Sequence, residues 1–166
     1  MSLADFVNVL QSYAGASASA PPANTQGDFA KVSQAAPQPH LADAIAEAFR
    51  SDQTPAFPQM LATLFNQSDG QQRAGILSQL LSAGGGSLSG PLLQQFSGLL
   101  RNPNVTPEQA NQVSASAVQQ LAEHAQTKDP SIVDRASQFY AQHPTVVQAL
   151  GAGALALMMS HLSKRV

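Results

Sequence analysis

The chain has 166 residues and a formal net charge of −2, from eight Lys and Arg against ten Asp and Glu. This length suits one domain with its own core. The sparse, balanced charge gives no basic patch for nucleic acid, and the absence of cysteine excludes disulfide and thiol chemistry. No basic segment precedes an apolar run at the amino end, so we expect no secretory signal and a cytoplasmic protein.

Apolar residues recur at helical spacing along the chain, so the sequence predicts an all-α protein. Residues 1–14 are predicted to form a short amphipathic helix with Phe6, Val7 and Leu10 on its apolar stripe. Residues 15–38, rich in Ala, Ser, Pro and Gln, are predicted to be a flexible linker, with a single helical turn around Phe29 and Val32 as the alternative. We therefore expect a loosely tethered helix whose apolar side chains bind in a partner's groove.

Residues 39–166 are predicted to form one helical domain, an orthogonal or irregular bundle of about six to eight short helices. The boundaries of these helices are marked by residues typical of caps and breaks. Starts are predicted at Thr54-Pro55, Asp69, the capping box Thr106-Pro107-Glu108-Gln109 and Asp129-Pro130, and ends at Gly84-Gly85-Gly86 and Asn102-Pro103. Pro144 then begins the last helix.

Two of the predicted helices share a pattern: Gln71-Gln72-Arg73-Ala74-Gly75-Ile76-Leu77 matches Gln94-Gln95-Phe96-Ser97-Gly98-Leu99-Leu100. A glycine inside a helix costs about 1 kcal/mol relative to alanine, and close approach of a second helix is the usual physical use of such a glycine. One interpretation is that Gly75 and Gly98 face each other in a helical hairpin with close packing. The other interpretation is that the two segments are similar by chance in a Gln- and Leu-rich chain.

A glycine- and leucine-rich stretch, residues 84–96, is followed by Val105-Thr106-Pro107-Glu108-Gln109-Ala110 and then by Val118-Gln119-Gln120-Leu121-Ala122. In this order of segments, residues 71–126 resemble the YidB-like family of small bacterial proteins. The resemblance implies a bacterial helical protein of unassigned activity, and it implies no functional residue. The proline-rich linker and the terminal apolar segment depart from the family's pattern.

The segment from Val146 to Met159 is apolar around nearly its whole circumference and is predicted to lie in one helix, residues 145–162. Its 18 positions are marginal against the about 20 apolar residues that span a bilayer. The small residues Ala149, Gly151, Gly153 and Ala156 lie on adjacent faces and would permit close helix contact. We expect this helix at the centre of the bundle, with burial in a homo-oligomer and anchoring in a membrane as the alternatives.

Residues suited to catalysis or metal binding lack the required spacing. Glu123-His124 has no partner four residues away, and the other histidines, His40, His143 and His161, lie near helix ends. Asp43 and Glu47 share a predicted helix face that is typical of solvated residues. We therefore expect no catalytic residue, no cofactor and no metal.

The sequence thus predicts a non-catalytic helical module of protein–protein interaction or self-assembly, with a protein partner or a second copy as its ligand. A membrane-associated protein that uses residues 145–162 is the alternative. The remaining alternatives are an enzyme and a nucleic-acid binder.

Overall fold

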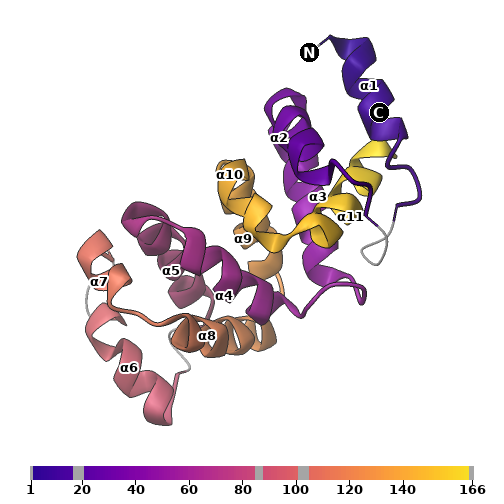
Figure 1. Ribbon diagram of the computed structural model, residues 1–166. Helices are drawn as coiled ribbons and strands as arrows, with labels where there is room; N and C mark the ends of the chain where they lie inside the picture. The colour runs from indigo at the N-terminus through magenta and orange to yellow at the C-terminus, as the bar shows by residue number, and fades with distance from the viewer. Residues whose placement is uncertain (1, 17–20, 85–87, 101–104, 165–166) are drawn as a thin grey trace. The chain divides into compact units, whose positions relative to one another are not determined.

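A computed structural model describes residues 2–16, 21–84, 88–100 and 105–164. All regular structure in these ranges is helical (Figure 1), which confirms the all-α prediction. In chain order the helices are α1 (Leu3–Gln11), α2 (Thr25–Ala35), α3 (Gln38–Arg50), α4 (Phe57–Gln67), α5 (Gly70–Gly84), α6 (Gly90–Leu100), α7 (Pro107–Asn111), α8 (Ala115–Lys128), α9 (Ile132–Ala141), α10 (Pro144–Val147), the 3₁₀ turn η2 (Gln148–Leu150) and α11 (Ala152–Ser163).

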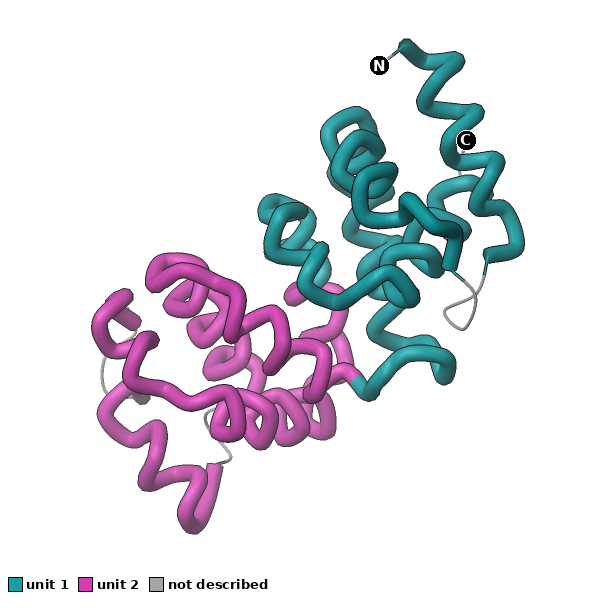
Figure 2. Tube along the Cα trace, in the orientation of Figure 1, with its two compact units in different colours: residues 1–56, 137–166 teal, residues 57–136 magenta. Residues whose placement is uncertain are grey.

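The chain divides into two compact units, which differ from the predicted single domain of residues 39–166 (Figure 2). Unit 1 joins residues 1–56 to residues 137–166, and unit 2 consists of residues 57–136. The predicted domain boundary at residue 39 was placed from local composition. Composition does not show that residues 137–166 complete the core of the amino-terminal helices.

In unit 1, α11 packs against α1, α2 and α3. The apolar side chains Leu155, Met158, Met159 and Leu162 of α11 are buried. Burial of so many apolar groups supplies the main driving force for docking these helices. The terminal helix therefore contacts three other helices of unit 1.

The predicted flexible linker, residues 15–38, is wrong where α2 occupies Thr25–Ala35, and the alternative of a helical turn around Phe29 and Val32 is correct in position but too short. Phe29 and Val32 are fully buried on one face of α2. Such a polar helix has little intrinsic stability, and packing of these two side chains stabilises it. Residues 17–20 lie outside the described ranges.

The prediction of a loosely tethered first helix is also wrong, because α1 packs against α2 and α11. Phe6 and Leu10 are buried in this contact, and Tyr13 just beyond the helix is fully buried. The Tyr13 hydroxyl donates a 2.6 Å hydrogen bond to Asp28 Oδ2 on α2. Phe6 and Leu10 of the predicted stripe therefore belong to the core of unit 1, whereas Val7 is half-buried and Leu3 is exposed.

The apolar carboxyl-terminal segment does not form the predicted continuous helix of residues 145–162. Gly151, with φ of 90°, separates α10 and η2 from α11. Side chains on both sides of the break are buried, Val146 and Val147 before it and Leu155 after it, so the bend lets both parts pack in unit 1. Within the described residues, no helix is long and apolar enough to cross a bilayer.

In unit 2, α8 packs against α4, α5 and α6, and α5 packs against α7. The contact between α5 and α8 is close at Gly84, where an added Cβ would lie 2.9 Å from the Ala125 Cα. Gly98, in contrast, is exposed, and an added Cβ there would have no other atom within 4 Å. The predicted close packing at Gly98 is therefore wrong, and α5 and α6 are not among the helices that pack extensively on each other in the described residues.

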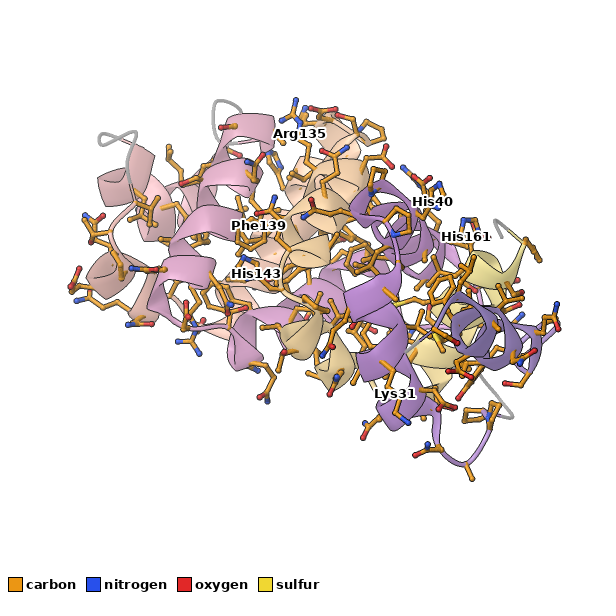
Figure 3. The ribbon with its side chains drawn as sticks, turned by 90° about the horizontal axis from the view of Figure 1, so that it is seen from above. Lys31, His40, Arg135, Phe139, His143 and His161 are labelled. Carbon is orange, nitrogen blue, oxygen red and sulfur yellow. The ribbon has the colours of Figure 1, made fainter. Side chains whose placement is uncertain are left out.

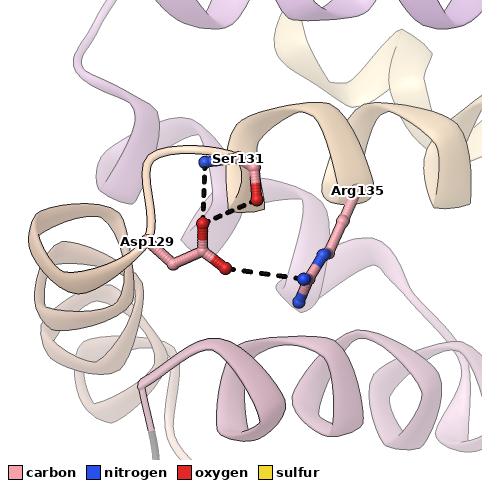
Figure 4. A network of polar contacts seen from close by, with 3 residues as sticks. All are labelled: Asp129, Ser131 and Arg135. Carbon is pink, nitrogen blue, oxygen red and sulfur yellow. Dashed lines mark hydrogen bonds and ion pairs between the residues drawn. The ribbon is translucent and has the colours of Figure 1, made fainter.

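The turn from α8 to α9 is held by the carboxylate of Asp129 (Figure 4). Its Oδ1 accepts hydrogen bonds from the Ser131 backbone N–H at 3.2 Å and from the Ser131 hydroxyl at 2.6 Å. Its Oδ2 lies 3.5 Å from an Arg135 nitrogen. These contacts lower the pKa of Asp129, and the hydrogen bond from the Ser131 hydroxyl has the largest effect. Asp129 directly follows the last residue of α8, and α9 begins three residues later at Ile132, so Asp129 stabilises the turn between the two helices.

Candidate functional site

Unit 2 contains a cleft of about 410 Å³ between α6 and the segment that joins α7 to α8. We call it the α6–α8 cleft. Four of its lining residues are apolar, one is a glycine, and four carry a carboxamide or a hydroxyl: Phe96, Leu99, Val113, Ala117, Gly98, Gln95, Gln109, Gln112 and Ser114.

One wall of the cleft is α6, which packs on α8. Phe96 is fully buried and Leu99 is 8% exposed, so these two side chains fix the helix to the core beneath the cleft. Gln95 and Gly98 lie beside them at the open edge and are exposed. Because Gly98 has no side chain, the backbone of α6 is accessible from the cleft at this point.

The opposite wall depends on two successive helix caps. Thr106 Oγ1 accepts from the Gln109 N–H at 3.1 Å, and Gln109 Oε1 accepts from the Thr106 N–H at 3.1 Å, which is the predicted capping box. After the short α7, Ser114 Oγ accepts from the Ala117 N–H at 3.1 Å and caps α8. The two caps fix the backbone from Gln109 to Ser114, which carries the polar rim of the cleft.

Arg73 of α5 donates two hydrogen bonds to the end of α4 and one to α7. Its guanidinium donates to the carbonyl oxygens of Phe65 and Asn66 at 3.0 and 3.1 Å, and to Asn111 Oδ1 on α7 at 3.3 Å. The guanidinium carbon also lies 5.1 Å from the centre of the Phe65 ring. The planar fork of arginine joins the end of α4 to α7, which lysine could not do.

Among the described residues, none that lines the cleft has an ionisable side chain. These described residues supply no general acid, no general base and no nucleophile with an activating partner. What they offer is apolar side chains beneath the cleft and a rim of neutral groups that both donate and accept hydrogen bonds. This arrangement suits the binding of an uncharged surface.

None of the interaction residues predicted in the terminal segments lines this cleft. Of these, Phe6, Leu10 and Ala156 are buried, Val7, Gly151 and Gly153 are half-buried, and Ala149 is exposed. Ala149 and Gly153 do not share one helix face, because the break at Gly151 separates them. Gly98 is the one predicted site residue that lines the cleft, and it does so without the close helix contact expected of it.

The described residues contain no group of three or more His, Asp or Glu side chains placed to hold a metal ion. His143 lies against Phe139, with 5.1 Å between ring centres (Figure 3). The Nε2 atom of His161 is buried and has no hydrogen-bond partner in the described part of the chain. The four histidines of the chain lie on different helices: His40 on α3, His124 on α8, His143 directly before α10 and His161 on α11.

No protein-family model matches this chain, and neither a curated protein nor a solved structure does. The resemblance of residues 71–126 to the YidB-like family stays a prediction.

Proposed function

We propose that this chain is a non-catalytic module that binds a protein, and that the α6–α8 cleft is its binding surface. The observation that carries the proposal is the lining of this cleft, whose described residues are either apolar or carry neutral polar groups. Ligand sites are concave and mostly apolar, with a few polar groups that orient the bound molecule.

The exposed surface of α6 supports the same function. Leu93 is 40% exposed and is one of only two large apolar side chains that the described residues leave exposed, the other being Leu3. α6 contains no charged residue, although helices on a protein surface usually carry charges on their solvated side. An uncharged, partly apolar helix at the edge of a cleft is typical of a surface that a partner covers.

The proposal is tested by cross-linking from the cleft. A photoreactive amino acid replaces Gln112, which is exposed at the rim, or Glu123, which is exposed on α8 but does not line the cleft. We expect a discrete covalent adduct in extracts of the source cells from position 112 and none from position 123. The mass of the adduct distinguishes a second copy of this chain from a different protein.

A matched pair of variants links the adduct to the cleft. Gly98→Leu fills the cleft from an exposed helix position with open space around it, and Ser97→Leu adds the same side chain one residue away, outside the lining. We expect Gly98→Leu to abolish the adduct and Ser97→Leu to leave it unchanged. Equal adducts from positions 112 and 123, or an adduct that survives Gly98→Leu, would contradict the proposed function.

A further inference from the structure

We infer that the segment around α7 is a strap that opens on its own and controls access to the α6–α8 cleft. The name α7 strap is used below for residues 105–113, which include α7 and supply Gln109, Gln112 and Val113 to the lining of the cleft. This inference rests on the proposed function, because it describes how a partner reaches the same cleft. It follows from the low burial of the strap, from its contacts with α5 and from the burial of the apolar residues on α6.

The α7 strap places little apolar surface in the core. Ala110 is its one buried residue, whereas Thr106, Glu108, Asn111 and Gln112 are exposed. A single buried methyl group contributes little hydrophobic stabilisation, and a helix of five residues has almost no stability of its own. The strap can therefore detach at a much lower free-energy cost than α5 or α8, whose apolar faces lie in the core.

Two contacts fasten the strap to α5. At the start of α7, Pro107 lies against Gly70, where an added Cβ would be 3.0 Å from the Pro107 Cβ. At the end of α7, Asn111 Oδ1 accepts the 3.3 Å hydrogen bond from Arg73, and Asn111 Nδ2 would lie 3.1 Å from the same added Cβ. Asn111 is exposed, so water competes for its hydrogen bond. Single substitutions at Gly70 or Asn111 should therefore loosen the strap.

Opening of the strap changes what the cleft presents to a partner. In the closed form, the large apolar side chains of the α6 wall are covered, because Phe96 is fully buried and Leu99 nearly so. Gln112 and Val113 of the strap line the same cleft from the opposite wall. Moving this wall away widens the cleft above the apolar side chains. A partner that binds them selects the open form, and its apparent affinity is proportional to the open fraction.

Thiol labelling measures the opening without any partner, because the chain has no cysteine of its own. Ala117→Cys places a thiol on a buried residue of α8 that lines the cleft. Ala122→Cys, the matched control, places one on a buried residue of the same helix outside the lining. Each is combined in the full chain with Asn111→Ala, Asn111→Asp or Gly70→Ala, and the rate of reaction with iodoacetamide is measured under native conditions.

The three variants have different expected effects on the labelling rate at position 117. Asn111→Ala should raise it about three- to tenfold, because the hydrogen bond from Arg73 is lost. Gly70→Ala should also raise it, because the added methyl group pushes Pro107 and Asn111 away even though alanine favours the helix α5. Asn111→Asp keeps an acceptor and adds a charge that attracts the guanidinium, so the rate should not exceed that of the parent. The rate at position 122 should change by less than about twofold in all three.

Two labelling results would overturn the inference. Equal changes at positions 117 and 122 would show that the variants loosen unit 2 as a whole. A rate at position 117 that neither Asn111→Ala nor Gly70→Ala changes would show that the strap does not open on its own.

The cross-linked adduct from position 112 tests the control of access. We expect a higher yield of this adduct with Asn111→Ala than with Asn111→Asp, and the reverse order would overturn the gating role, because the closed strap would then hold the partner. If labelling is as expected and no protein gives the adduct, the opening of the strap is supported and the proposed function is wrong.

Discussion

Replacing Gly84 with alanine tests the close contact between α5 and α8. An added Cβ would lie 2.9 Å from the Ala125 Cα, 3.2 Å from the His124 Cδ2 and 3.3 Å from the Ala125 Cβ. The nearest of these atoms belongs to the backbone of α8, so no side-chain rotation relieves the contact. The helices α5 and α8 must separate to accept one methyl group.

The expected change in the free energy of unfolding is the difference between two opposing effects. Overpacking a close contact costs about 1–3 kcal/mol, whereas alanine in place of glycine in a helix gains up to about 1 kcal/mol. Because Gly84 is the last residue of α5, the helix gains little stability from alanine at this position. We expect Gly84→Ala to lower the free energy of unfolding of unit 2 by about 1–2 kcal/mol.

The matched control is Gly98→Ala, in the interior of α6 with nothing within 4 Å of the added Cβ. This variant should raise the stability by about 0.5–1 kcal/mol, because only the helix preference changes. Urea titrations followed by circular dichroism, with hydrogen exchange of the α5 and α8 amides, measure both variants. If Gly84→Ala is as stable as Gly98→Ala, the inferred contact between α5 and α8 is wrong.

Three further changes have expected outcomes. Arg73→Lys should destabilise unit 2 by about 1–2 kcal/mol in urea titrations, because an ammonium cannot reach all three acceptors. The control is Arg135→Lys, which changes an exposed ion pair and should cost less than about 0.5 kcal/mol. Burial, and then the hydrogen bond to Asp28, raise the pKa of Tyr13 from 10.0 to about 12. The stability that the neutral phenol contributes is therefore complete below about pH 10 and is lost as the pH rises through about 12, and Tyr13→Phe should remove this loss from alkaline unfolding curves. Gly151→Ala should destabilise unit 1 by about 1–2 kcal/mol, measured by hydrogen exchange in α11, because its φ of 90° strains any side chain.

Each of these outcomes can fail in a recognisable way. Equal losses from the two arginine substitutions would show that the geometry of the guanidinium is unimportant. An alkaline transition that persists in Tyr13→Phe would assign the titration to another group. A Gly151→Ala protein as stable as its parent would show that the two parts of the terminal segment can join without a left-handed residue.

Helix caps were predicted well from the sequence, because a cap depends on residues three positions apart. The capping box Thr106–Gln109 is confirmed, and Asp69 accepts from the Gln72 N–H at 2.8 Å as expected of a cap. Thr54 is the exception. Its hydroxyl donates to the Ala48 carbonyl at 2.5 Å, so it caps the end of α3, while α4 begins only at Phe57.

Features set by contacts between distant segments could not be predicted in this way. Gly84 was interpreted as the end of a helix, and only the position of α8 makes it a close contact. The local pattern around Gly151 favours one straight helix, and packing of Val146 and Leu155 on either side of the bend outweighs it. The α6–α8 cleft combines residues from α6, α7 and α8, so no single stretch of sequence indicates it.

The division of the chain into units has a consequence for synthesis on the ribosome. Unit 2 is continuous in sequence, residues 57–136, whereas unit 1 needs residues 137–166 to complete its core. Domains fold as units while the chain emerges from its amino end. We therefore expect the unit with the cleft to fold first, while α1, α2 and α3 wait for α11 with their apolar faces uncovered. During that interval these three helices are the part of the nascent chain most exposed to chaperones and to aggregation.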